Sequence, residues 1–330
     1  MQVSQHQPEL VSTDESEALI SGIEQGVADP RAGIFGPQSM SWKVNRESAL
    51  FLAAGRAALL QLAHPWVATA LDQHSKLMAR PIARFHSTFR IVFAMVFGSR
   101  EQASAAARHL YNVHTYIRGD MPEDVAAYSR GSEYQANEIA ALRWVYATLV
   151  ESAVLAYECV MPPLSAAELA VYFEEAKTMA ALFGLPRTAL PGHWSSFLAY
   201  CREMEGSNLL GVSATARAMG QNLLRGAGSW IKPPRWYRAL TAQWMPERFR
   251  NEFDLPLGEL ERRAAERARH WLPVVYHRLP RAIRLVGPWH EAHSRMLGKR
   301  PGLVARWSNR FWIGEPMLPF AEAAASRREP

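Results

Sequence analysis

The residues best suited to chemistry are an arginine and a tyrosine on one predicted helix. Arg143 and Tyr146 lie in a run from about 134 to 160 that has no glycine or proline, and apolar side chains recur there every three, four and seven residues. This periodicity predicts a helix that buries at least one face, with Tyr146 on that face and Arg143 as its neighbour. A phenol there can donate a hydrogen bond or act as a general acid, and a guanidinium beside it would lower its pKa. The alternative is a core tyrosine whose hydroxyl is satisfied by a neighbour.

Histidine is the other residue type here that could bind a metal or move a proton. Of the 11 histidines, those in helical and partly apolar settings are His64, His74, His109 and His114. His114 lies near the end of a predicted helix that closes at Gly119, where a histidine also interacts favourably with the helix dipole without any further role. His64 precedes a proline, so packing of a helix end is the alternative there as well.

Signatures of several other enzyme classes are missing. The sequence has no Gly-x-Gly-x-x-Gly, no Walker loop, no Gly-x-Ser-x-Gly and no His-Glu-x-x-His. A di-iron bundle would need repeated Glu-x-x-His pairs, and the nearest approach is Glu291-x-His293. Cys159 and Cys201 lack metal-type spacing, so we expect buried thiols in a reducing compartment.

Composition and charge narrow the class of protein. The chain is 48% hydrophobic with 11 tryptophans, which excludes disorder for most of its length. The net charge is +6, but the basic residues are scattered, so we expect solvated helix surfaces and no nucleic acid partner. Charges interrupt every apolar stretch of about 18 residues, and the first residues do not resemble a signal peptide. We therefore expect no membrane span and a cytoplasmic location.

The pattern along the chain predicts an all-α fold, because strand-like alternation is nearly absent and no sheet is expected. Residues 1–30 are polar and aperiodic and are predicted to be a loose arm. Residues 31–330 are predicted to form a single large helical domain with an aromatic-rich helical C-terminal extension. The predicted helices are about 46–63, 65–74, 82–97, 101–117, 134–160, 165–184, 192–205, 209–224, 257–272 and 288–297. Asn45 is the expected N-cap of the first, and Pro273 the expected stop of the ninth.

Seven short motifs follow one another between residues 33 and 185. They are Gly33-Ile34-Phe35-Gly36-Pro37, Leu59-Leu60-Gln61-Leu62-Ala63-His64-Pro65, Asp72-Gln73-His74-Ser75, Phe97-Gly98, His114-x-x-Ile117-Arg118-Gly119, Trp144-Val145-Tyr146-Ala147-Thr148-Leu149-Val150-Glu151-Ser152 and Pro163-Leu164-Ser165. In this order and spacing they resemble the family that contains the MpaB-type oxygenases and, more remotely, the latex-clearing rubber oxygenases. The C-terminal third resembles that family only loosely.

The resemblance implies an oxidoreductase: an all-helical fold that holds a haem b and uses dioxygen on an apolar or unsaturated small molecule. It implies that Tyr146 stands where the rubber oxygenases have the proximal haem ligand, the histidine of a Trp-Val-His-Ala-Thr-Leu pattern. It also implies that His114-Thr115, about 30 residues earlier, corresponds to their distal Lys-Thr pair. Thr115 and Arg118 become candidate pocket or propionate partners, and His64 and His74 candidate cofactor-binding residues.

A tyrosine at the position of the proximal histidine leaves three interpretations open. Tyr146 could bind ferric haem as a phenolate, with Arg143 stabilising the anion. His114 could instead be the axial ligand, with Tyr146 as a hydrogen-bond donor in the pocket; imidazole needs no help to bind iron, which favours His114. Finally, haem could be lost, leaving a small-molecule binding protein or a cofactor-independent enzyme that uses Tyr146 and Arg143.

Overall fold

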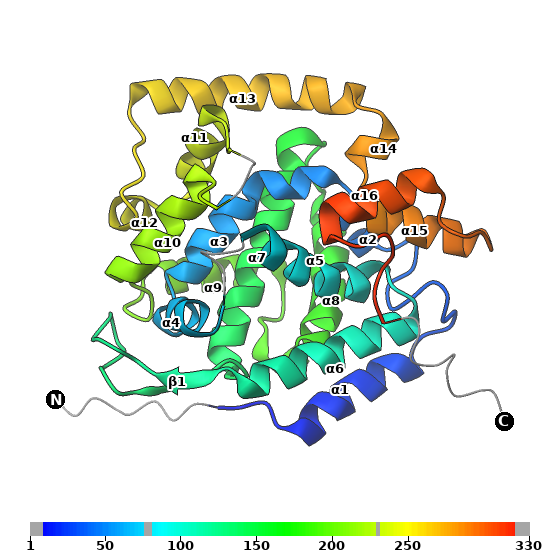
Figure 1. Ribbon diagram of the computed structural model, residues 1–330, viewed down its shortest axis with the longest axis horizontal. Coiled ribbons are helices and arrows are strands. Elements are labelled where there is room, and N and C mark those ends of the chain that lie inside the picture. Colours follow the sequence, from blue (N-terminus) through cyan, green and yellow to red (C-terminus); the bar gives the residue numbers. More distant parts are fainter. Residues whose placement is uncertain (1–8, 76–80, 229–231, 321–330) are drawn as a thin grey trace.

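A computed structural model describes residues 9–75, 81–228 and 232–320. Figure 1 shows helices packed around one long central helix, α7 (Ile139–Val160), with α13 (Glu259–Arg278) along one edge of the molecule and α1 (Thr13–Gln25) and α6 (Arg100–Tyr116) along the opposite edge. The other helices are α2 (Met40–Asn45), η1 (Ser48–Ala53), α3 (Ala54–Leu62), α4 (Pro65–His74), α5 (Pro81–Phe97), α8 (Ala166–Leu182), η2 (Arg187–Ala189), α9 (Trp194–Gly206), α10 (Ala214–Arg225), α11 (Arg235–Trp244), α12 (Glu247–Glu252), α14 (Arg281–Arg284), α15 (Gly287–Met296) and α16 (Leu303–Ile313). The all-α prediction is confirmed.

One small sheet interrupts the helical chain between α6 and α7. Strands β1 (Arg118–Asp120) and β2 (Glu133–Gln135) pair antiparallel, with Gly119 opposite Tyr134. Three-residue strands are too short for an alternation pattern to show in the sequence. The hairpin shortens the helix predicted over 134–160, which begins only at Ile139.

The prediction of a loose arm over residues 1–30 is wrong where α1 forms. Ser12 and Glu15 make a reciprocal capping box at its start, and Ile20 is buried in the main core. The capping box was the available signal, and the polar composition of the segment obscured it. Residues 1–8 lie outside the described residues.

Two predicted helix boundaries are also wrong. Asn45 does not cap a helix over 46–63: it is the last residue of α2, and its Nδ2 donates to the Ser41 carbonyl, while the chain continues as η1 and then α3. Pro273 does not stop its helix either, because α13 continues to Arg278. Proline removes one helix hydrogen bond, and α13 lies at the edge of the molecule, where water can satisfy the freed carbonyl (Figure 1).

The core is built on α7. Its side chains pack in the main apolar cluster with the last turns of α5 and with α8. Among the described residues, α7 is the one helix long and apolar enough to cross a membrane, but 56% of its most apolar stretch is buried inside the molecule, as in a core helix. A buried charge joins α3 to α7: Arg56, 5% exposed, donates to Ser152 Oγ at 3.0 Å and to Glu151 Oε2 at 2.8 Å.

Candidate functional site

Tyr146 is a core residue that ties α7 to α8. Its side chain is 4% exposed, its ring packs beside Phe183, and its hydroxyl donates to the Ala176 carbonyl at 2.5 Å. Burial, and after it the neighbouring Tyr172, raises the pKa of Tyr146 well above the ordinary value. The group is therefore a neutral phenol that is already hydrogen-bonded within the protein.

Arg143 does not contact the Tyr146 hydroxyl, although the helix makes the two residues neighbours. Its Nη1 donates to the Ala189 carbonyl at 3.1 Å, and its guanidinium carbon lies 4.8 Å from the ring centroid of Tyr200 on α9. Burial raises the pKa of Tyr200 to about 12, and the charge of Arg143 opposes that rise. The arginine therefore acts on Tyr200 rather than on Tyr146.

His114 lies in the last turn of α6 with a partly enclosed imidazole. Neither ring nitrogen is hydrogen-bonded within the described residues, and Nδ1 is shut off from solvent although the residue as a whole is half-buried. Burial lowers the pKa of His114 to about 4, and the charge of Arg84 on α5 contributes. The imidazole is therefore neutral near pH 7, which is the form that binds metals.

Thr115 and Arg118 of the predicted site have other neighbours than the imidazole of His114. Thr115 Oγ1 donates to the Asn112 carbonyl of its own helix at 2.7 Å. Arg118 is exposed at the start of β1, and its carbonyl faces His74 Nε2 at 3.1 Å. Neither side chain is brought to the imidazole of His114 by any hydrogen bond or ion pair of the described residues.

The remaining predicted histidines hold loops in place. His64, 2% exposed, precedes α4, packs against Trp66 and Tyr128, and faces Tyr128 Oη at 3.4 Å through Nε2; burial lowers its pKa to about 4. His74 ends α4 in an exposed position, and its Nε2 also faces Tyr134 Oη on β2 at 3.1 Å. Both histidines thus fasten α4 to the segment between α6 and α7.

The predicted site residues therefore fall at separate places, and the described part of the chain has no group of three or more His, Cys, Asp or Glu residues arranged to hold a metal. What the sequence did not predict is the approach of Arg84 to His114, and of Arg143 to Tyr200. An arginine in the otherwise apolar start of α5 was the one signal for the first pair. The second has none in the sequence, because α7 and α9 meet only in the fold.

The helix that carries Arg84 is open to solvent beside His114. No residue of Pro81–Val92 is buried, although this part of α5 has apolar residues on every face, whereas all of Phe93–Phe97 are buried. This part of α5 is therefore partly exposed along its length, with one side packed on Phe51 of η1 and on α16. Arg84 is solvent-accessible yet enclosed by enough protein to lower its pKa.

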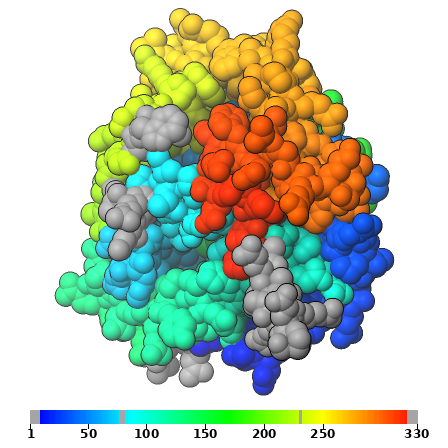
Figure 2. All heavy atoms as spheres, turned by 45° about the vertical axis from the view of Figure 1, so that its right-hand side comes forward, coloured from blue at the N-terminus to red at the C-terminus, as the bar shows by residue number. Residues whose placement is uncertain are grey.

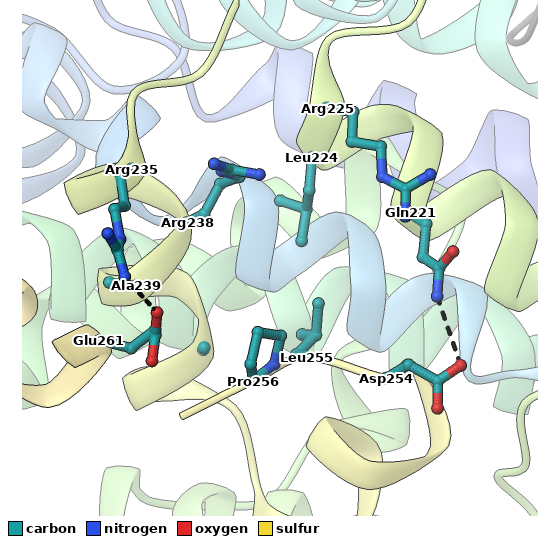
Figure 3. A pocket seen from close by; sticks show the side chains of 11 residues that line it. Gln221, Leu224, Arg225, Arg235, Arg238, Ala239, Asp254, Leu255, Pro256 and Glu261 are labelled. Carbon is teal, nitrogen blue, oxygen red and sulfur yellow. Dashed lines mark hydrogen bonds and ion pairs between the residues drawn. The ribbon is translucent and has the colours of Figure 1, made fainter. Parts of the chain in front are cut away.

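A pocket of about 250 Å³ lies elsewhere, between α10, α11 and the chain leading into α13. Figure 3 shows Arg225 and Arg238 on either side of Leu224, with Leu255 and Pro256 opposite. Arg235 is paired with Glu261 at 2.8 Å, and Gln221 reaches Asp254 at 3.4 Å. None of the site residues predicted from the sequence lines this pocket.

Comparison with known proteins identifies the family. The family model described as "ER-bound oxygenase mpaB/B'/Rubber oxygenase, catalytic domain" matches residues 42–284. The match begins after the first of the quoted motifs and continues beyond residue 185, into the third of the chain expected to match only loosely. No curated protein and no solved structure matches. Because the family model spans most of the chain, from α2 to α14, this protein belongs to the MpaB and rubber oxygenase catalytic-domain family.

Proposed function

We propose that this protein is an oxygenase-like enzyme of the cytoplasm that binds haem b through His114 and acts with dioxygen on an apolar small molecule. Membership of an oxygenase family supports the reaction class and a small-molecule substrate. The observation that carries the assignment of the ligand is the neutral imidazole of His114, which makes no hydrogen bond within the described residues. Free cysteines, with Cys201 buried, agree with a reducing compartment.

Of the two candidate ligands, His114 is better suited to haem than Tyr146. A ligand must offer a lone pair, and His114 could do so without breaking a hydrogen bond to any of the described residues. Tyr146 would have to leave the Ala176 carbonyl and ionise in a setting that raises its pKa, with no contact from Arg143 to help. The interpretation in which Tyr146 is a phenolate ligand is therefore not supported.

Residues of the chain itself would hold the haem and shield it from water. Arg84, whose charge already acts on His114, would pair with a carboxylate of the cofactor. The apolar residues of Pro81–Val92 on α5 would bind an apolar substrate and exclude water from it. Haem, when bound, would supply the oxidation chemistry.

The test is whether the protein holds haem at all. Protein expressed with ample haem precursor is examined by absorption spectroscopy and native mass spectrometry, and hemin is titrated into protein made without it. We expect a Soret band and one haem mass per chain. Absence of both, with no uptake of added hemin, would reject the proposal.

One observation favours a second function without haem. Tyr200 Oη and Arg143 Nε are both shut off from solvent with no hydrogen bond of ordinary geometry, and the two side chains lie together. A buried phenol beside a guanidinium can bind a carboxylate or an enolate, or act as a general acid. This pair takes the place of Tyr146 and Arg143 in the haem-free alternative. Stoichiometric iron with the mass of haem would exclude it.

A further inference from the structure

Helix α16 lies outside the residues that match the family and exposes an unusually apolar face. Its outer side chains are Leu303 (83% exposed), Val304 (53%), Trp307 (64%) and Phe311 (44%), spaced so that they share one side of the helix. We call these four residues the α16 face. Figure 2 shows α16 in red at the surface, with α14 and α15 in orange beside it. Ile283 of α14, which contacts α16, is 52% exposed as well.

The exposure does not result from poor packing, because the inner side of α16 is well packed. Asn309 on that side is fully buried and donates to Glu291 Oε2 at 2.6 Å. Trp312 stacks on Phe51 of η1 with ring centroids 4.3 Å apart. The helix is therefore fixed in place with its four outer apolar side chains in water. Large apolar side chains gathered on a surface mark a contact with another apolar body.

Within the described residues, the unpaired charges of the segment that carries the α16 face have one sign. Residues 292–314 contain no aspartate or glutamate. Four exposed cations lie in this segment, and none of their side chains has an ion pair or hydrogen bond with the described residues: Lys299, Arg300, Arg306 and Arg310. The carboxylates that flank the segment are already engaged, since Glu291 is 4% exposed and Glu315 accepts from Arg90 Nη1 at 2.7 Å.

We propose that the α16 face seats this protein on the surface of a bilayer that contains anionic lipid. An interfacial helix of this kind combines aliphatic and aromatic side chains on one side with arginine and lysine at its edges. A second copy of the chain fits less well, because it would bring four uncompensated cations against four others. A nucleic acid would satisfy the cations, but it would leave Leu303 and Val304 without apolar partners.

Helix α16 packs on α5, so a bilayer bound at the α16 face would lie near α5. His86 Nε2 of α5 faces the Phe311 carbonyl at 3.0 Å, and the Arg90–Glu315 pair joins the same two segments. An apolar molecule leaving the bilayer would thus meet Pro81–Val92, the partly exposed part of α5. This route to the substrate site rests on the proposed function, whereas the binding to the bilayer does not.

The test is co-sedimentation of the full chain with vesicles of phosphatidylcholine, with and without phosphatidylglycerol. We expect binding to the anionic vesicles that weakens in high salt. Replacing the aromatics together, Trp307→Ser with Phe311→Ser, should weaken it by about tenfold or more. Removing two charges, Arg306→Gln with Arg310→Gln, should weaken it by about 30-fold. No haem or activity is needed, so the outcome is independent of the proposed function.

Matched controls lie on α13, towards its first turns. Leu260→Ser removes an apolar side chain that is 63% exposed, and Arg262→Gln with Arg267→Gln removes two exposed charges. Both controls should bind as the wild type does. The proposal is overturned if the wild type ignores anionic vesicles, or if the α16 variants bind as well as the controls. It is also overturned if the chain is a dimer that ignores vesicles and becomes a monomer on replacing Trp307 and Phe311.

Discussion

Replacing Tyr146 with phenylalanine removes one hydroxyl from a side chain that is 4% exposed and hydrogen-bonded to the Ala176 carbonyl at 2.5 Å. That carbonyl belongs to α8 and keeps its helical partner four residues on, so the substitution leaves no buried acceptor unpaired. The expected cost is therefore the net value of a single buried hydrogen bond, about 1 kcal/mol of unfolding free energy. Haem content should not change, because Tyr146 is not the ligand.

Tyr157 provides the matched control on the same helix. It is 3% exposed, and its hydroxyl makes no hydrogen bond with the described residues. Urea unfolding followed by circular dichroism should show a lower midpoint for Tyr146→Phe and an unchanged one for Tyr157→Phe, with equal denaturant slopes. Haem per chain, measured on both variants, should equal the wild type. Loss of haem in Tyr146→Phe alone would show that the phenol is a ligand and would refute this reasoning.

Three further changes test the fold around the site. Arg56→Met removes the buried guanidinium that binds Glu151 and should cost about 3 kcal/mol or more in urea unfolding; a cost below about 1 kcal/mol would show that the pair is not structural. Gly33 and Gly131 share a φ of +78°, but an added Cβ would lie 2.1 Å from the Gly98 carbonyl oxygen at Gly33 and meets nothing within 4 Å at Gly131. Gly131→Ala should therefore cost about 1 kcal/mol, and Gly33→Ala clearly more by the same assay; equal costs would contradict the close approach. Burial lowers the pKa of His64 from 6.5 to about 4, so the unfolded chain binds more protons between these values. The stability that is full above pH 6.5 therefore falls as pH drops towards 4. The wild type should lose about 3 kcal/mol more than His64→Gln over this window, and parallel pH profiles would contradict the assignment.

Local periodicity was enough to predict most of the fold. Predicted helices over 65–74, 82–97 and 101–117 agree with α4, α5 and α6 to within one residue, because caps and prolines stand at their ends. The central helix was found from its apolar spacing. Where prediction failed, the causes differ. The polar composition of α1 hid its capping box and its packing on α6 and α8, whereas α13 tolerates Pro273 because it lies at the edge of the molecule.

The candidate site was less predictable, because helix geometry places backbones and not the ends of long side chains. Arg143 and Tyr146 are neighbours on α7, yet one side chain turns to Tyr200 and the other to the Ala176 carbonyl. Which way each turns depends on α8 and α9, which are distant in sequence. The approach of Arg84 to His114 likewise depends on the packing of α5 against α6.

The most direct measurement is hemin titration of His114→Ala beside His74→Ala. Both variants remove an imidazole from the end of a helix, but His74 faces the Arg118 carbonyl and Tyr134, whereas His114 makes no hydrogen bond with the described residues. If His114 is the ligand, the wild type and His74→Ala give the same Soret band at one haem per chain, and His114→Ala gives none while keeping its circular dichroism. A Soret band of unchanged position and stoichiometry in His114→Ala would contradict the assignment.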